Sequence, residues 1–227
     1  MLGGFRWLAL ETWFLDPAIA YYRDVLDRPV DRRGEGHAVV DVGAHAIHLR
    51  EPGPVPRGGL HVHYALATTP AHFDDWYDTL AAAGDVWDHE FGDTRSVYGY
   101  DPDDHCIEIG TVAEGDAALG GVFEVALEVE ALDRATAFYE ALGFEVVDRG
   151  TDRRRHRLDG PIAVELWEPQ RGIAEARGGV HTHLGFAAAD PTAAVAPITT
   201  TATAVDDIDD GVRVRDPDGH YLTITTR

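Results

Sequence analysis

Two short stretches of the sequence carry paired histidines in the same setting. The segments RGGLHVHYAL (57–66) and RGGVHTHLGF (177–186) each place two histidines one residue apart early in an expected β-strand. The first copy is followed by Glu108, a carboxylate within the otherwise apolar segment CIEIG. A carboxylate that faces a protein core is costly unless it is paired or coordinated. Imidazole and carboxylate groups together bind divalent transition metals, so these residues raise the question of a metal site.

The histidine strands belong to a larger internal repeat. Three further pairs of segments match in the same order: 5–26 with 123–144, 47–52 with 164–169, and 101–109 with 216–224. The repeat predicts two homologous domains, 1–112 and 122–227, joined by a linker of small residues at 113–121.

Each predicted domain divides again into two modules of the order βαβββ. Along the first domain, segments in which apolar and polar residues alternate are followed by segments in which apolar residues recur at helical spacing. The expected strands are 5–12, 37–41, 45–50, 61–67, 95–100 and 105–110, and the expected helices are 16–26 and 70–83. A helix over 190–203 is only weakly indicated, because Pro191, Pro197 and a run of threonines interrupt it. Asp-Pro followed by Asp or Gly predicts a tight turn before the last strand of each domain. The expected fold class is α+β.

The chain is strongly acidic. Its 227 residues include 40 acidic residues against 19 basic ones, all of them arginine, which gives a formal net charge of −21. Such a charge repels nucleic acid and anionic membranes, so neither is an expected partner. It resembles the charge of proteins from salt-accumulating microbes, where high salt screens self-repulsion.

No segment indicates export or membrane insertion. No apolar run approaches the ~18 residues that a membrane span needs, and the first residues lack a basic region and a cleavage site. The single cysteine, Cys106, excludes an internal disulfide and fits a reducing compartment. We therefore expect a cytoplasmic protein.

Several motifs resemble a known superfamily. The segments LDRATAFYEALGF, GGLHVHYAL and YGYDPDDHCIEI are similar to those of the vicinal oxygen chelate superfamily, which includes glyoxalases, bleomycin-resistance proteins and extradiol dioxygenases. The resemblance covers nearly the whole chain. It implies two glyoxalase-like domains with curved, cup-shaped mixed sheets, and metal ligands on the first and last strands of each module. The same fold hosts lyases, isomerases, dioxygenases, thiol transferases and metal-free binders, so it does not fix the reaction.

The resemblance distributes ligand positions unevenly over this chain. The positions in the first domain are Trp7, His48, His63 and Glu108. The positions in the second domain are Glu124, Glu165, His183 and Thr223. If modules pair within a domain, the metal ligands are His48, His63 and Glu108, because Trp7 cannot bind a metal. If modules pair across the domains, one cup contains His63, Glu108, Glu124 and Glu165. Both arrangements use His63 and Glu108.

Neighbouring residues complete the candidate site. His61 shares a strand face with His63 and is expected to support the ligands from outside. Tyr98 is expected to donate a hydrogen bond to a substrate oxygen. Cys106 alternates with Glu108, although a buried and inert thiol is the commoner fate. The basic island DRRRHR (152–157) either attracts an anionic substrate or balances nearby acids.

The resemblance implies a metal-dependent enzyme with a small-molecule substrate. We expect Fe, Mn, Ni or Zn as a Lewis acid in a glyoxalase-like lyase or isomerase, with Glu108 or a glutamate of the second domain moving a proton. One alternative is an extradiol dioxygenase with Fe(II), against which Trp7 counts. Another is a metal-free binding protein, consistent with Trp7 and Thr223 at ligand positions. We expect a monomer or a homodimer.

Overall fold

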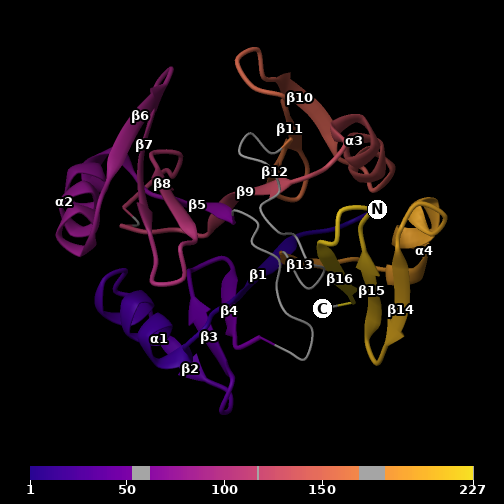
Figure 1. Ribbon diagram of the computed structural model, residues 1–227, viewed down its shortest axis with the longest axis horizontal. Helices are drawn as coiled ribbons and strands as arrows, with labels where there is room; N and C mark the ends of the chain where they lie inside the picture. Colours follow the sequence, from indigo (N-terminus) through magenta and orange to yellow (C-terminus); the bar gives the residue numbers. More distant parts are fainter. Residues whose placement is uncertain (53–61, 117, 169–181, 227) are drawn as a thin grey trace. The chain divides into compact units, whose positions relative to one another are not determined.

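The computed structural model describes residues 1–52, 62–116, 118–168 and 182–226 (Figure 1). The elements follow the predicted βαβββ order four times. The first module consists of β1 (Phe5–Glu11), α1 (Leu15–Asp24), β2 (Val30–Arg32), β3 (His37–Asp41) and β4 (Ala46–Arg50). The second consists of β5 (His63–Ala67), the 3₁₀ turn η1 (Pro70–His72), α2 (Phe73–Ala83), β6 (Trp87–Phe91), β7 (Thr94–Tyr100) and β8 (Cys106–Gly110).

The same order continues in the second half of the chain. The third module consists of β9 (Val122–Glu128), α3 (Leu132–Ala141), β10 (Glu145–Arg149), β11 (Arg155–Asp159) and β12 (Ala163–Trp167). The fourth consists of β13 (His183–Ala187), α4 (Pro191–Val195), η2 (Ala196–Ile198), β14 (Ala204–Ile208), β15 (Gly211–Arg215) and β16 (Tyr221–Thr225).

The strands form two curved mixed sheets, which confirms the α+β class. One sheet has the order β14-β15-β16-β13-β1-β4-β3-β2, and the other has the order β10-β11-β12-β9-β5-β8-β7-β6. The first sheet therefore draws on the first and fourth modules, and the second on the second and third. Each contains a parallel pair, β13–β16 or β5–β8, next to antiparallel hairpins.

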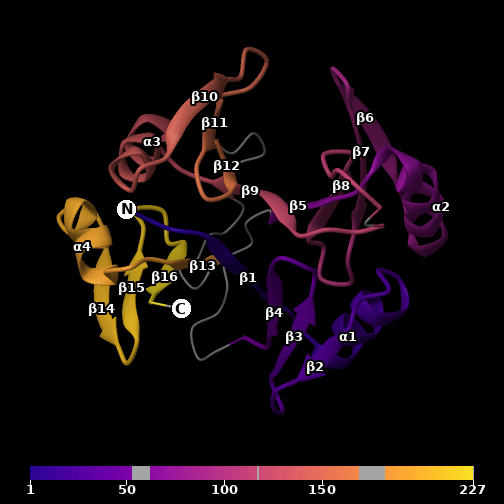
Figure 2. The same cartoon turned by 180° about the vertical axis from the view of Figure 1, so that it is seen from behind.

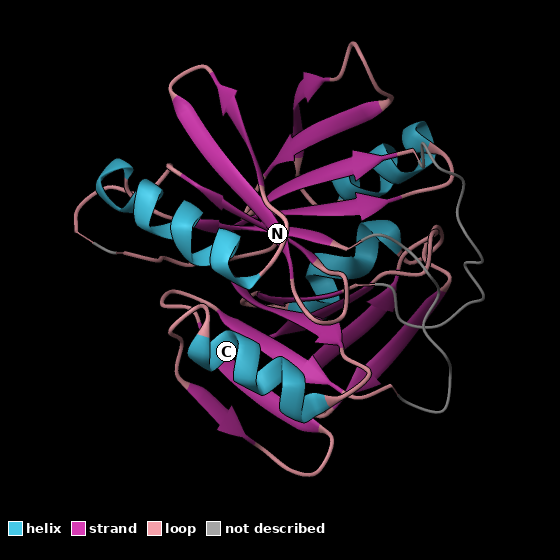
Figure 3. Ribbon diagram, turned by 60° about the vertical axis from the view of Figure 1, so that its left-hand side comes forward, coloured by secondary structure: helices cyan, strands magenta, loops and turns pink. Residues whose placement is uncertain are grey.

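The chain divides into two compact units. Unit 1 comprises Met1–Leu10, Pro52–Leu60 and Ala126–Arg227, and unit 2 comprises Glu11–Glu51 and His61–Val125. In unit 2, α1 packs on β3 and β4, and α2 packs on β7; Figure 2 shows both helices from behind. In unit 1, α3 packs on β12 and α4 on β15, and Figure 3 shows the helices in cyan against the magenta strands. Among the described residues, no helix is both long and apolar enough to cross a membrane.

The helices form where the sequence supplies an apolar stripe or a cap. Helix α1 buries Leu15, Ala18 and Tyr22, which share one face at helical spacing. In α4 the Asp190 carboxylate accepts a hydrogen bond from the Ala193 amide at 3.0 Å. The weakly indicated helix over 190–203 is a five-residue helix followed by a 3₁₀ turn that contains a proline.

In the first two modules, two strands had no sequence signal. Strands β2 and β6 lie at the edges of their sheets, and every residue of β6 is exposed. Alternation appears in a sequence only where one face of a strand is buried, so these edge strands lack it.

The predicted Asp-Pro turn is confirmed in the second module. The Asp101 carboxylate accepts hydrogen bonds from the backbone amides of Asp103 and His105, both at 2.9 Å. The next turn residue, Asp104, has a φ of 62°, and Gly219 takes the equivalent place in the fourth module with a φ of 99°. Both conformations lie in the left-handed region, which Asp tolerates and Gly favours.

Candidate metal centre

His63 and Glu108 meet because β5 and β8 are parallel neighbours. The register pairs Ala65 with Glu108, and His63 lies on the same strand face as Ala65. His63 Nε2 and Glu108 Oε2 are 2.9 Å apart, and the two side chains are 6% and 8% exposed. The structure therefore brings together the two residues that both predicted pairings share.

Glu108 is held by donors on two strands. Ser96 Oγ on β7 donates to Glu108 Oε1 at 2.6 Å, and His63 contacts the other oxygen. Tyr98 lies directly opposite Glu108 in the antiparallel β7–β8 register. Burial alone would raise the pKa of Glu108, but the hydrogen bonds from His63, Ser96 and Tyr98 outweigh burial and lower that pKa below its ordinary value. Glu108 is therefore an anionic oxygen donor in a dry setting.

Glu124 completes the cluster from β9. One donor atom each of His63, Glu108 and Glu124 lies within 4.8 Å of the others, and all three residues are buried. Two buried carboxylates this close repel one another unless a cation or a proton lies between them. One imidazole nitrogen and two carboxylate oxygens match the ligand chemistry of a divalent transition metal with open coordination positions. The residues present therefore fit a divalent cation.

Aromatic and thiol groups border the cluster. Tyr98 lies edge-on to His63 with ring centroids 5.8 Å apart, and it stacks on Trp87 at 5.4 Å. Burial and then the charge of Glu108 raise the pKa of the Tyr98 hydroxyl, which therefore remains a proton donor. The same two causes raise the pKa of Cys106 to about 12, so its thiol is protonated and not nucleophilic.

His48 is not brought to this cluster. It lies on β4, in the other sheet, where its Nδ1 is 3.2 Å from His37 Nε2 and 3.5 Å from an Arg50 nitrogen. Burial, followed by the charge of Arg50, lowers the pKa of His48 to about 4. The predicted outer partner His61 lies outside the described residues.

The second-half candidates Glu165 and His183 both belong to unit 1. Glu165 accepts hydrogen bonds from Trp167 Nε1 at 2.7 Å and from an Arg155 nitrogen at 3.0 Å. Its carboxylate is thus ion-paired with arginines of the basic island at 152–157. These ion pairs support the interpretation that the island balances nearby acids.

His183 meets an uncharged partner. His183 Nε2 is 2.8 Å from Thr223 Oγ1, and the ring lies edge-on to Trp7 with centroids 4.8 Å apart. Trp7 covers Gly185, where a Cβ would overlap the indole. Neither Trp7 nor Thr223 supplies a good ligand for a divalent metal.

A second group of donor atoms lies in the Asp-Pro turn. Asp101, Asp103 and His105 have donor atoms within 4.8 Å of one another. His105 Nδ1 is 2.8 Å from Asp101 Oδ2, and the Trp13 amide donates to Asp103 Oδ1 at 2.7 Å. These contacts hold the turn together, and we assign the group a structural role.

Ser96 is the contact that sequence reasoning missed. It lies two residues before Tyr98 in the same alternating strand and therefore on the same face. That spacing was the available signal, but serine is common on strand faces and does not by itself indicate a site.

Known proteins of similar sequence or structure have the same fold. Residues 8–109 match the family model for the Glyoxalase/Bleomycin resistance protein/Dioxygenase superfamily. The metallothiol transferase FosB of Staphylococcus epidermidis is 26% identical over 118 residues, which cover 49% of this chain and 85% of that protein. The crystal structure of glyoxalase I from Zea mays superposes with a TM-score of 0.73 at 17% identity, covering 98% of this chain and 92% of that one.

Proposed function

Because residues 8–109 belong to the Glyoxalase/Bleomycin resistance protein/Dioxygenase superfamily, we propose that this chain is a divalent-metal-dependent lyase or isomerase of a small oxygen-chelating substrate. The observation that carries the proposal is the convergence of His63, Glu108 and Glu124 in a buried site. Members of this superfamily typically use a divalent metal, which when bound acts as a Lewis acid on adjacent substrate oxygens.

The two carboxylates have different surroundings and, we infer, different roles. Glu108 has its oxygens engaged by Ser96 and His63, and its lowered pKa makes it a poor proton acceptor. It serves as a fixed ligand. Glu124 approaches from another strand, and we assign it the transfer of a proton on the substrate, which requires a carboxylate within reach of the reacting carbon. The neutral Tyr98 hydroxyl orients a substrate oxygen.

A lyase or isomerase fits this donor set better than a dioxygenase does. The facial site of non-haem Fe(II) oxygenases uses two histidines and one carboxylate. Here the cluster has one histidine and two carboxylates, and His48 lies in the other sheet.

The test is the metal content of the protein purified in molar salt. We expect about one Fe, Mn, Ni or Zn per chain in the wild type, and loss of that metal in His63→Ala and Glu124→Gln. His183→Ala is the matched control, because it removes the equivalent histidine of β13 and should retain the metal. If the wild type takes up no metal after reconstitution, the proposal fails, and the metal-free binding alternative is then tested by a ligand screen.

A further inference from the structure

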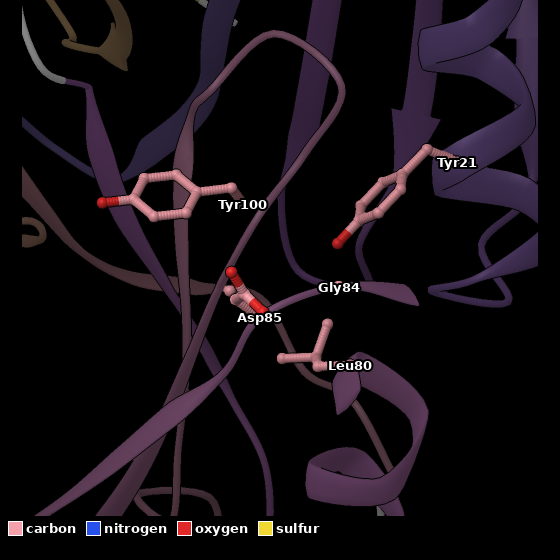
Figure 4. A pocket seen from close by; sticks show the side chains of 6 residues that line it. Tyr21, Leu80, Gly84, Asp85 and Tyr100 are labelled. Atoms are coloured by element: carbon pink, nitrogen blue, oxygen red, sulfur yellow. The ribbon is translucent and has the colours of Figure 1, made fainter. Parts of the chain in front are cut away.

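A cavity lies in unit 2 where α1, α2 and the end of β7 meet (Figure 4). Its volume is about 200 Å³, and its lining residues are Tyr21, Leu80, Gly84, Asp85, Gly99 and Tyr100. Gly99 faces α2, since a Cβ there would lie 3.7 Å from Leu80, whereas its neighbour Tyr98 faces His63. Adjacent strand residues point to opposite faces, so the cavity beside Gly99 is separate from the candidate metal centre. The Tyr100 ring packs on Trp87, as the Tyr98 ring does, and therefore lies on the other side of β7 from Gly99.

The cavity is large enough for a small organic molecule. An apolar cavity of about 150 Å³ accepts benzene. Two of the lining positions are glycines, and a Cβ at Gly84 would meet no atom within 4 Å. The walls therefore leave room beside the Leu80 side chain.

The chemistry of the lining favours a positive charge. Asp85 supplies a carboxylate and Tyr21 supplies a phenol ring, and none of the described residues that line the cavity is an arginine. In Figure 4 the Tyr21 hydroxyl points toward Asp85, while the Tyr100 hydroxyl points away. Within the described part of the chain, neither the Tyr21 hydroxyl nor the Asp85 carboxylate has a hydrogen-bond partner. Burial, followed by the charge of Asp101, raises the pKa of Tyr21, so its oxygen stays neutral and available as an acceptor.

We propose that this cavity binds a small organic cation, with one ammonium group on a compact apolar body. Asp85 neutralises the charge, and the Tyr21 ring attracts the cation through its quadrupole. A bare metal ion is a poorer occupant, because it requires several oxygen donors and Asp85 is the one carboxylate among the described residues that line the cavity.

The experiment is calorimetric titration with choline and with 3,3-dimethyl-1-butanol, its uncharged isostere, at constant ionic strength. We expect choline to bind the wild type about tenfold more tightly than the isostere. Asp85→Asn should weaken choline binding about two- to fivefold and leave binding of the isostere unchanged. Asp78→Asn is the matched control, because it removes an exposed carboxylate on α2 outside the cavity and should change neither affinity.

A filling variant tests the location. Gly99→Ala adds a methyl group at ordinary contact distance from Leu80, so the fold should persist while both ligands bind more weakly. Thermal unfolding of each variant shows whether the fold is intact. Equal affinity for choline and the isostere, an unchanged choline affinity in Asp85→Asn, or no binding of choline to the wild type would each overturn the proposal.

Discussion

The parallel pairs β5–β8 and β13–β16 share one backbone design. In each pair a histidine begins the first strand. The residue two places after it pairs with the partner strand at Glu108 in the first copy and at Thr223 in the second. His63 Nε2 lies 2.9 Å from Glu108 in one pair, and His183 Nε2 lies 2.8 Å from Thr223 in the other. The register, the histidine and the hydrogen-bond length are thus conserved between the two copies, while the partner changes from a carboxylate to a hydroxyl.

The other residues around the two histidines are also less acidic in the second pair than in the first. On the neighbouring antiparallel strand, Tyr98 pairs with Glu108 and Arg213 pairs with Thr223. Glu124 joins His63, whereas the indole of Trp7 covers His183. The first pair therefore gathers negative charge around its histidine, and the second places a hydroxyl and an aromatic ring there. The proposed metal site therefore depends on these few side chains and not on the fold, which both copies have.

Replacing the partner of each histidine should give the largest contrast. Glu108→Gln removes an anionic ligand and its charge, so metal affinity should fall by more than about 100-fold, beyond the effect of losing an outer partner. Thr223→Val removes the corresponding partner of His183 and should leave metal affinity unchanged. Titration against a competing chelator measures both. Equal losses in the two variants would contradict the assignment of the metal to β5–β8.

Ser96 should have a smaller effect through Glu108. Ser96→Ala removes the 2.6 Å hydrogen bond that orients the carboxylate, so metal affinity should fall about 10- to 100-fold. Thr79→Ala is the control, because the Thr79 hydroxyl donates to a backbone carbonyl within α2, away from the cluster. Retention of wild-type affinity by Ser96→Ala would show that His63 and Tyr98 suffice to orient Glu108.

Parts of this contrast were readable in the sequence and parts were not. The duplication, Glu108 in an apolar strand and the Asp-Pro turn were predictable because they depend on local spacing and on burial patterns. The sequence did not predict which modules share a sheet. The alternation of buried and exposed residues in β5 is the same whichever strand lies beside it, and the choice of neighbouring strand depends on contacts between distant segments. Both pairings were therefore open, and the strand order follows the one across domains. Ser96 became recognisable only once β7 was placed beside Glu108.

The packing of Trp7 provides a further test on the other pair. Gly185→Ala places a methyl group where the indole lies, and displacing the ring should cost about 1–3 kcal/mol of unfolding free energy. The equivalent position of β5 is already Ala65, which is fully buried. Urea unfolding of Gly185→Ala, of Trp7→Ala and of the double variant measures the coupling. The methyl group should cost little once the indole is gone; an equal cost with and without Trp7 would exclude the overlap as its cause.

The smallest expected effect concerns His48, the histidine of β4 that lies beside His37 and Arg50. Its pKa of about 4 is below the ordinary 6.5, so protons bind this residue more readily in the unfolded chain than in the folded one. The stabilisation from neutral His48 is therefore fully present above pH 6.5 and is lost as the pH falls from 6.5 toward 4. With solvent screening of this partly exposed group, the loss should be about 1 kcal/mol.

Urea unfolding at pH 7.5 and at pH 4.5 measures this loss in the wild type and in His48→Gln. The variant should lose less stability on acidification than the wild type, by that same amount of about 1 kcal/mol. An identical loss in both proteins would mean that His48 is protonated as easily in the folded state as in the unfolded one. A smaller loss in His48→Gln would instead show that this histidine is held neutral by burial and neighbouring cations, an environment opposite to the carboxylate-rich one around His63.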